Sequence, residues 1–197
     1  MPGPLLSDLD GTVADTGPAI VESLHVTCAA FGLDLPDDLS FVFGPPLHRV
    51  LERLGVADDD MAEAIAVFQA AHVERVDLCT PMPGADVVLH ELASCGVKIG
   101  VATIKPQAIA ELVLEAVGLA DVVHALHGRA DDMDPSTKTD LVRAAWRELG
   151  GDEPLYVGDH DGDEVAAREL GIPFLWYPES DWCAIGTAVL AGSASHA

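Results

Sequence analysis

Two aspartates stand two positions apart near the start of the chain, shortly after the apolar residues Pro4, Leu5 and Leu6. This pattern predicts a short buried strand that ends in Asp8 and Asp10. Alternate side chains of an extended segment point the same way, so both carboxylates face one site. Ligands of open α/β sheets bind at the carboxyl ends of the strands. Two acids at such an end indicate a bound cation, a proton-transfer role, or both.

Three later segments place further polar groups after predicted strands. They are Thr103, Lys138 at the start of a helix that begins near Ser136, and the acidic turn that contains Asp159 and Asp163. A hydroxyl, an ammonium group and two carboxylate-bearing turns suit phosphoryl transfer. Lys138 and Thr103 can bind phosphoryl oxygens. We therefore expect the substrate to be a small phosphorylated metabolite.

The four carboxylates of this set would repel one another if they met in one pocket. Mg²⁺ held by oxygen ligands relieves that repulsion, so we predict Mg²⁺ as the cofactor. The candidate metal ligands are Asp8, Asp10, Asp159 and Asp163. One carboxylate could attack phosphorus, and another could protonate the departing alkoxide. The spacing alone leaves open which of Asp8 and Asp10 does which.

The composition restricts the possible partners. The chain has 197 residues, with ten Lys and Arg against 33 Asp and Glu, and a formal charge of −23. Such a charge repels a phosphate backbone, so we expect no nucleic-acid partner. A phosphate ester would need a metal ion or well-placed lysines. The sequence does not indicate an oligomeric state.

The four cysteines are scattered and form no Cys-x-x-Cys pair, so we expect buried free thiols. No apolar run approaches the length of a membrane span, and no leader pattern is present, so we expect no membrane partner. These features predict a cytoplasmic protein.

Alternation of strand-like and helical patterns from residue 85 onward predicts an α/β fold, a doubly wound parallel sheet with helices on both faces. The expected strands are Leu5–Ser7, Val97–Thr103, Val122–Leu126, Leu155–Gly158 and Pro173–Tyr177. The expected helices among them are Ala85–Cys95, Ala108–Val117, Leu141–Leu149 and Glu164–Leu170.

About 90 residues separate the first two strands, where a simple crossover needs far fewer. Amphipathic helices are expected in this segment at Thr16–Phe31, Pro46–Leu54 and Asp58–Val76. We therefore predict a small all-helical cap domain at residues 16–80, and a catalytic core at residues 1–15 and 81–197.

Four motifs in this order resemble the haloacid dehalogenase superfamily, and within it the phosphoglycolate phosphatase-like enzymes. The motifs are Asp8-Leu9-Asp10-Gly11-Thr12, Ala102-Thr103-Ile104-Lys105-Pro106, Lys138 with its helix, and Gly158-Asp159-His160-Asp161-Gly162-Asp163. The resemblance implies a Mg²⁺-dependent phosphatase, a phosphoric monoester hydrolase that forms an aspartyl-phosphate.

The resemblance also implies roles for single residues. Asp8 would be the nucleophile and Asp10 the general acid and base. Asp8, the backbone carbonyl of Asp10 and Asp159 would bind Mg²⁺, while Thr103 and Lys138 would hold the phosphoryl group. Asp163 would support the metal or orient Lys138.

Two other functions fit the same carboxylates. A phosphosugar mutase of the β-phosphoglucomutase type would return the phosphoryl group to a sugar. A receiver-like signalling domain would accept phosphate once, although the order of motifs and the helical insertion disfavour it.

Several other polar residues could be functional, but the sequence favours an ordinary structural role for most of them. His48, Arg49 and Arg75 could recognise the leaving group from the cap, although a solvated face suits each better. His160 could touch substrate. Lys105 is expected to begin the next helix with Pro106, and His124 and His127 are expected to be structural.

Overall fold

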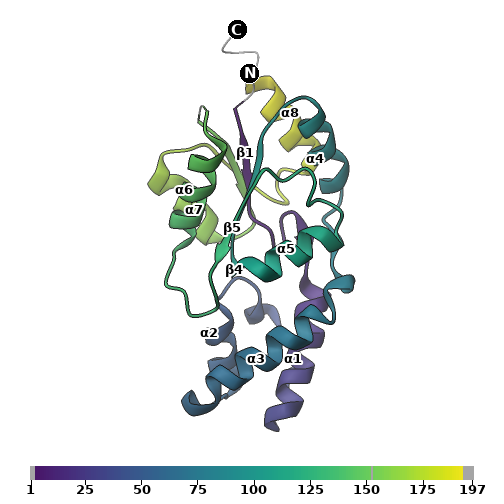
Figure 1. The fold of residues 1–197 in the computed structure, drawn as a ribbon, viewed down its shortest axis with the longest axis vertical. Coiled ribbons are helices and arrows are strands. Elements are labelled where there is room, and N and C mark those ends of the chain that lie inside the picture. Colours follow the sequence, from purple (N-terminus) through teal and green to yellow (C-terminus); the bar gives the residue numbers. More distant parts are fainter. Residues whose placement is uncertain (1–2, 152, 193–197) are drawn as a thin grey trace.

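The core of the molecule is a parallel sheet of five strands. The computed structural model describes residues 3–151 and 153–192. Figure 1 shows the sheet with helices on both sides. The order across the sheet is β5 (Ala125–Arg129), β4 (Ile99–Pro106), β1 (Leu5–Ser7), β6 (Leu155–Gly158) and β7 (Phe174–Trp176). All neighbouring strands are parallel. The predicted α/β fold is confirmed.

The two faces of the sheet carry separate hydrophobic clusters, because successive strand residues point to opposite faces. Leu5 packs in the cluster that contains residues of α4 (Ala85–Ser94), α5 (Gln107–Ala116) and α8 (Trp182–Gly192). Leu6 packs in the other cluster, with residues of α6 (Lys138–Leu149) and α7 (Asp161–Leu170). The sheet is therefore doubly wound, and β1 lies at its centre.

Two strands begin later than the sequence predicts. β4 begins at Ile99 rather than Val97, and β5 begins at Ala125 rather than Val122. The N–H of Val97 donates to the carbonyl of Leu92 in the turn that closes α4. A run of apolar residues indicates that the segment is buried. It does not distinguish a buried residue of a turn from a buried residue of a strand.

Helix α8 is an element that the sequence analysis did not predict. Its Trp182 is almost fully buried, and the indole Nε1 donates to the carbonyl of Thr12 at 3.0 Å. Small residues fill most of the rest of the helix, so no amphipathic pattern indicated it. The helix supports the loop that follows β1.

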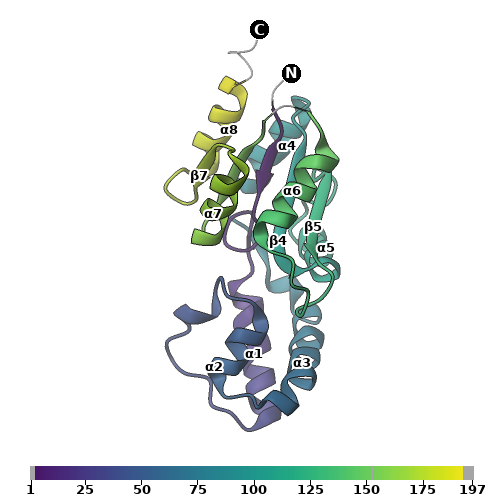
Figure 2. The same ribbon diagram turned by 90° about the vertical axis from the view of Figure 1, so that its left-hand side faces the viewer.

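The segment between β2 (Ala14–Asp15) and β3 (Thr80–Pro81) is helical. It holds α1 (Gly17–Phe31), α2 (Leu47–Leu54) and α3 (Met61–Val73), together with the short 3₁₀ turns η1 (Ser40–Val42), η2 (Asp58–Asp60) and η3 (Val76–Leu78). These elements bury a hydrophobic cluster of their own around Leu24, Leu51 and Phe68. Figures 1 and 2 show them as a separate lobe beyond the carboxyl ends of the strands.

The chain enters and leaves this lobe through two paired segments. β2 (Ala14–Asp15) and β3 (Thr80–Pro81) form an antiparallel pair, with Ala14 opposite Pro81. Both crossings therefore lie side by side, next to the loop that carries Asp8 and Asp10.

All four cysteines are free thiols, as expected. Cys28 and Cys79 are buried, whereas Cys95 and Cys183 are exposed, so the expected burial is wrong for the latter two. Cys95 follows the last turn of α4, and Cys183 lies in the first turn of α8. Among the described residues, no helix combines the length and the apolar character that a bilayer crossing needs.

Candidate active site

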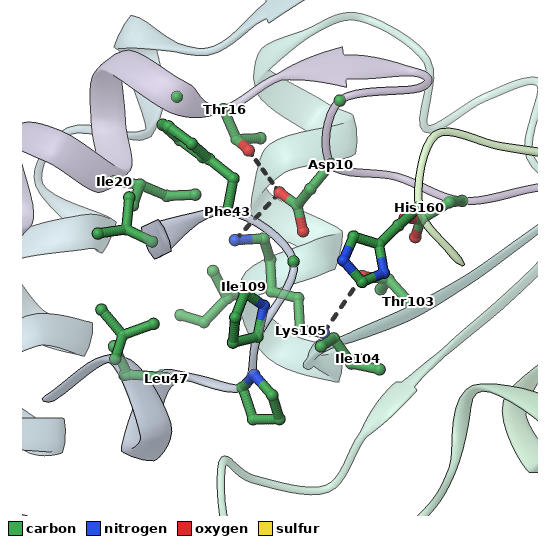
Figure 3. Close-up of a pocket in the computed structure, with 18 of the residues that line it drawn as sticks. Asp10, Thr16, Ile20, Phe43, Leu47, Thr103, Ile104, Lys105, Ile109 and His160 are labelled. Atoms are coloured by element: carbon green, nitrogen blue, oxygen red, sulfur yellow. Dashed lines mark hydrogen bonds and ion pairs between the residues drawn. The ribbon is translucent and has the colours of Figure 1, made fainter. Parts of the chain in front are cut away.

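A cavity of about 540 Å³ lies between the carboxyl ends of the strands and the helical lobe (Figure 3). Asp8, Asp10, Thr103, Lys138 and Asp159 all line it, and Asp163 lies at its floor. The structure thus brings together every residue that the sequence analysis assigned to phosphoryl transfer and metal binding.

Asp8 and Lys138 form an ion pair at the floor of the cavity. The Nζ of Lys138 lies 2.6 Å from Oδ1 of Asp8 and 3.1 Å from Oδ1 of Asp163. It also donates to the carbonyl of Ala102 at 3.2 Å, at the end of β4. Lys138 begins α6, whose N-cap Thr137 forms a reciprocal capping box with Asp140. The first turn of α6 therefore fixes the position from which the ammonium group reaches the acids.

Burial is the main influence on both groups of this pair. It raises the pKa of Asp8 to about 8, against the lowering effect of Lys138, while Asp163 and Asp10 raise it further. For Lys138, burial lowers the pKa, but the charges of Asp8 and Asp163 outweigh it and hold the pKa above its usual value. An additional positive charge at this site would favour the ionised form of Asp8.

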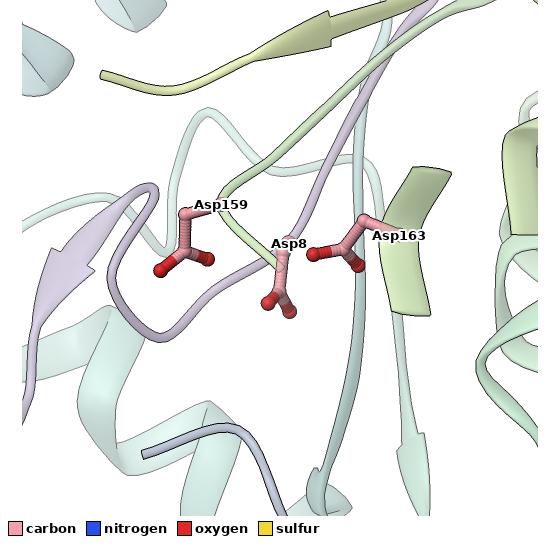
Figure 4. A group of neighbouring side chains, drawn as sticks. All are labelled: Asp8, Asp159 and Asp163. Carbon is pink, nitrogen blue, oxygen red and sulfur yellow. The ribbon is translucent and has the colours of Figure 1, made fainter. Parts of the chain in front are cut away.

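Asp8, Asp159 and Asp163 form a compact three-carboxylate group, shown in Figure 4. One oxygen from each lies within 4.8 Å of the others. Hard oxygen donors at such separations are the donor set that Mg²⁺ prefers. The residues present therefore fit a divalent cation.

Asp159 is held at the edge of this group by the loop after β1. Its Oδ1 accepts a hydrogen bond from the hydroxyl of Thr12 at 3.0 Å. Gly11 has a φ of 77°, and a Cβ on it would collide with Oδ2 of Asp159. Glycine is thus required at position 11 for the turn and for the close approach of the acid. Burial raises the pKa of Asp159, the Thr12 hydrogen bond opposes the rise, and the charge of Asp163 adds to it.

Asp163 uses both of its carboxylate oxygens within the protein. Oδ1 accepts from the hydroxyl of Tyr156 at 2.6 Å and lies beside Lys138, while Oδ2 accepts from the backbone N–H of His160 at 3.2 Å. The side chain is fully buried. This arrangement orients Lys138 and caps the N-terminus of α7.

Asp10 turns away from the three-carboxylate group and toward the helical lobe. Its Oδ1 accepts from the hydroxyl of Thr16 at 2.5 Å and lies 3.3 Å from Nζ of Lys105. Burial raises the pKa of Asp10, but Lys105 and the Thr16 hydrogen bond outweigh it, so that the pKa lies below its ordinary value. The carboxylate is therefore ionised at neutral pH and lies on the side of the cavity that faces the helical lobe.

The expected role of Lys105 is wrong. The sequence predicts that it begins the next helix, yet β4 continues through it to Pro106, and α5 begins only at Gln107. β4 keeps its pairing with β5 at Pro106 and Arg129, after an irregularity beyond Ala102. The strand therefore carries Lys105 into the cavity.

Thr103 is almost fully buried beneath the cavity. Its Oγ1 accepts a hydrogen bond from the backbone N–H of Lys105 at 3.2 Å. A hydroxyl that accepts in this way keeps its own proton for another acceptor, such as a phosphoryl oxygen.

The helical lobe touches the core through the loop before α2. Gly44 has a φ of 95°, and a Cβ on it would lie 2.5 Å from Nε2 of His160. The Nδ1 of His160 accepts from the backbone N–H of Gly162 at 3.2 Å. Across the cavity, Gln69 of α3 donates to Asp132 of the core at 2.6 Å. The lobe therefore contacts the core at two separate points around the cavity.

The structure places the cap candidates outside the cavity. Arg49 pairs with Glu52 on an exposed surface, and Arg75 donates to the carbonyl of Ala71. His48 has a buried Nδ1 that lacks a hydrogen-bond partner among the described residues, but it is not part of the lining.

The two remaining histidines lie apart from the acids. The Nδ1 of His124 accepts from the backbone N–H of Ile99, and His127 contacts Glu148. Neither belongs to the three-carboxylate group. Their contacts are those of structural residues.

His72 of α3 lines the cavity, and sequence reasoning missed it. It is 1% exposed, stacks on Phe68, and its Nδ1 lies 3.4 Å from the hydroxyl of Ser23. Burial lowers the pKa of His72 to about 4, and Lys105 contributes to the fall. The imidazole is therefore neutral at pH 7, and its position on an apolar helix face gave no signal of its contact with the cavity.

The chain is similar to known enzymes over most of its length. It is 34% identical to a phosphoglycolate phosphatase of Caulobacter vibrioides, over 84% of this chain and 75% of that protein. It is 30% identical to the tyrosine-protein kinase PtkA of Mycobacterium tuberculosis, over 84% of this chain, and this match spans 59% of the length of PtkA.

Solved structures show the same fold. A PtkA structure matches with a TM-score of 0.78 and 27% identity, over 89% of this chain and 83% of that chain. A haloacid dehalogenase-like family hydrolase from Streptococcus pneumoniae matches with a TM-score of 0.77 and 22% identity, over 89% and 84% of the two chains, which is evidence of fold alone. The family described as haloacid dehalogenase-like hydrolase matches residues 5–177. Its range includes β1 through β7 and all the acids of the cavity, and the chain therefore belongs to the haloacid dehalogenase-like hydrolase family.

Proposed function

We propose that this hydrolase is a Mg²⁺-dependent phosphatase that removes phosphate from a small phosphomonoester through an aspartyl-phosphate on Asp8. The observation that carries the proposal is the meeting of Asp8, Asp159 and Lys138 at the floor of one cavity. The naming of several relatives as phosphoglycolate phosphatases supports the phosphomonoester class.

Asp8 is the proposed nucleophile because it lies at the end of the central strand and at the floor of the cavity. Lys138 contacts one of its two oxygens. An oxygen of Asp8 attacks phosphorus, and the bond between phosphorus and the leaving oxygen breaks. Lys138 and the hydroxyl of Thr103 stabilise the charge on the transferring phosphoryl oxygens.

Asp10 is the proposed general acid and base. In the first half of the reaction Asp10, protonated from solvent, gives this proton to the leaving oxygen. The carboxylate that remains takes a proton from water in the second half. The resulting hydroxide attacks phosphorus, the bond to Asp8 breaks, and inorganic phosphate leaves. The pairs with Lys105 and Thr16 hold Asp10 toward the helical lobe, where the leaving group would lie.

We propose that Asp8, Asp159 and the backbone carbonyl of Asp10 hold Mg²⁺. The ion would supply positive charge that neutralises the acids and the phosphoryl oxygens. Asp163 serves in this proposal as a positioning residue, because its two oxygens are engaged by Tyr156, Lys138 and the N-terminus of α7.

The remaining parts of the proposal concern organisation and location. Residues 16–80 would act as a cap domain whose seating on residues 1–15 and 81–197 excludes bulk solvent while the phosphoryl group is transferred to Asp8. The paired segments β2 and β3 connect the two parts and would act as the hinge of such a movement. The reaction on a soluble metabolite suits a cytoplasmic location.

The test is release of inorganic phosphate from p-nitrophenyl phosphate with Mg²⁺. Sustained release that EDTA stops and added Mg²⁺ restores is the expected result. Release of at most one phosphate per chain would instead indicate a receiver-like acceptor. Incubation with a bisphosphorylated sugar distinguishes the mutase alternative, which would form a sugar isomer in preference to free phosphate.

A further inference from the structure

The side of the cavity that faces the leaving group carries no unpaired cation among residues 3–151 and 153–192. The two lysines in the lining are each paired with an acid of the site, Lys105 with Asp10 and Lys138 with Asp8. Lys138 is also the lysine proposed to bind the substrate phosphate. A second anionic group on the substrate would therefore find no lysine left to bind it.

The arginines of the helical lobe cannot supply this charge either. Arg49, Arg53 and Arg75 are the only Arg or Lys residues in positions 16–80. Arg49 pairs with Glu52, Arg53 lies over the ring of Phe41, and Arg75 donates to a backbone carbonyl. The structure places all three outside the lining of the cavity.

The two histidines of the lining each contact another group of the protein through Nδ1. His72 is buried, and its depressed pKa of about 4 leaves it uncharged at pH 7. His160 faces Gly44 with its Nε2 and accepts a backbone hydrogen bond at Nδ1. Asp15 and Asp132 add further negative charge to the lining, which repels an anionic leaving group.

The wall opposite the acids is apolar (Figure 3). Ile20 of α1, Phe43 of the loop before α2 and Leu47 of α2 approach from the lobe, and Ile104 and Ile109 approach from the core. Such a wall binds a ligand through removal of apolar surface from water. Asp10, the proposed proton donor to the leaving oxygen, lines the same cavity as this wall.

We propose that the substrate is a phosphate monoester of an uncharged alcohol with a mainly apolar body, and that Ile20, Phe43 and Leu47 bind that body. This substrate class deepens the phosphatase function proposed above and rests on it. Phosphoglycolate is a short ester with two anionic groups, a phosphate and a carboxylate. It would leave the apolar wall uncovered and its own carboxylate unpaired. The chain would therefore differ in specificity from the relatives named for phosphoglycolate.

The test compares kcat/KM for phosphoglycolate with that for ethyl, butyl and hexyl phosphate in the presence of Mg²⁺. Ethyl phosphate has a methyl group where phosphoglycolate has its carboxylate, and the three alkyl esters share the same leaving-group chemistry. We expect ethyl phosphate to exceed phosphoglycolate by at least about tenfold. We expect kcat/KM to rise roughly fourfold for each added methylene that the wall buries.

A matched pair of variants locates the effect. Leu47→Ala should lower the ratio of kcat/KM between hexyl and ethyl phosphate by roughly tenfold, because it removes apolar contact with the longer chain. Leu190→Ala changes a half-exposed leucine on α8, far from the cavity lining, and should leave that ratio unchanged.

The outcomes separate the two proposals. A preference for phosphoglycolate over ethyl phosphate, or equal values along the alkyl series, would overturn the apolar substrate class and leave the phosphatase function standing. Failure to hydrolyse any of the four esters or p-nitrophenyl phosphate, in a folded protein with Mg²⁺, would overturn the phosphatase function itself.

Discussion

The Nζ of Lys105 lies 3.3 Å from Oδ1 of Asp10, on the side of the cavity that faces the helical lobe. The other lysine of the lining, Lys138, contacts Asp8 on the opposite side. Asp8 and Asp10 therefore form ion pairs with different lysines. This division gives Asp8 and Asp10 separate electrostatic environments. Burial is the largest influence on both pKa values, but only at Asp10 do the nearby lysine and the Thr16 hydrogen bond outweigh it.

Lys105→Gln should raise the pKa of Asp10, because it removes the largest influence that lowers this pKa. Asp10 would then stay protonated, and able to act as an acid, up to a higher pH. The alkaline limb of the kcat/KM profile for ethyl phosphate should move to higher pH, since its alkoxide needs that proton. The limb for p-nitrophenyl phosphate should move less.

The control for this profile is Lys98→Gln, because the Nζ of Lys98 contacts the carbonyl of Leu149 away from the cavity. Its limb should coincide with that of the unmodified protein. A Lys105→Gln limb that does not move with ethyl phosphate would argue that Asp10 is not the acid.

Asp8→Asn should reduce release of phosphate by roughly a thousandfold or more, as expected for loss of a nucleophile. The folded protein should survive, because burial raises the pKa of Asp8 to about 8 and so disfavours its charge. The thermal midpoint should stay within a few degrees. Asp161→Asn changes an exposed acid of the same chain and should keep most activity. Substantial turnover by Asp8→Asn would remove Asp8 as the nucleophile.

Asp159→Asn and Asp163→Asn should affect different kinetic quantities, the Mg²⁺ requirement and kcat respectively. Loss of a metal ligand at Asp159 should raise the Mg²⁺ concentration for half-maximal activity by roughly tenfold or more. Loss of Asp163 should lower kcat at saturating Mg²⁺ instead, because Lys138 and Tyr156 lose a partner. Tyr156→Phe should resemble Asp163→Asn in a weaker form. Equal shifts in the Mg²⁺ requirement for both Asp variants would make Asp163 a ligand.

His72 should make the protein less stable as the pH falls from about 6.5 to about 4. Its pKa is about 4 in the folded protein, against 6.5 for an unperturbed imidazole, so the unfolded chain binds the extra proton in this window. The contribution of His72 to the free energy of unfolding is therefore fully present above pH 6.5. It falls by up to about 3 kcal/mol as the pH is lowered to about 4.

Urea unfolding at several pH values measures this effect. His72→Gln should show a shallower fall in the free energy of unfolding across the window than the unmodified protein. His25→Gln, at an exposed position of α1, should keep the original slope. Parallel slopes for the His72 variant and the unmodified protein would contradict the burial of a neutral imidazole.

The fold and the acidic centre could be predicted because they follow from strong local patterns. Apolar runs that end in Asp8 and Asp159 mark the ends of parallel strands, and such ends meet at one edge of a sheet. Residues 130 positions apart, such as Asp8 and Lys138, are brought together by this topology alone. The arrangement of strands therefore carries most of the information about the site.

Contacts between the lobe and the core could not be predicted in the same way. A helical pattern shows that Ile20 and Leu47 lie on an apolar face, but the same pattern describes a face that packs on helices and a face that lines a cavity. The sequence places Lys105 in a helix because the apolar run stops before it, whereas pairing with β5 extends the strand. Helix α8 could not be predicted at all, because its many small residues give it no amphipathic pattern.

Support for the loop after Asp10 comes from a residue 170 positions further along the chain than the group it contacts. The indole of Trp182 donates to the carbonyl of Thr12, between the nucleophile strand and the segment that leads to the lobe. A nascent chain that has not yet reached position 182 holds both acids of the first motif and lacks this hydrogen bond. Order in the loop after Asp10 is therefore completed only once residue 182 has been made, long after the loop's own residues.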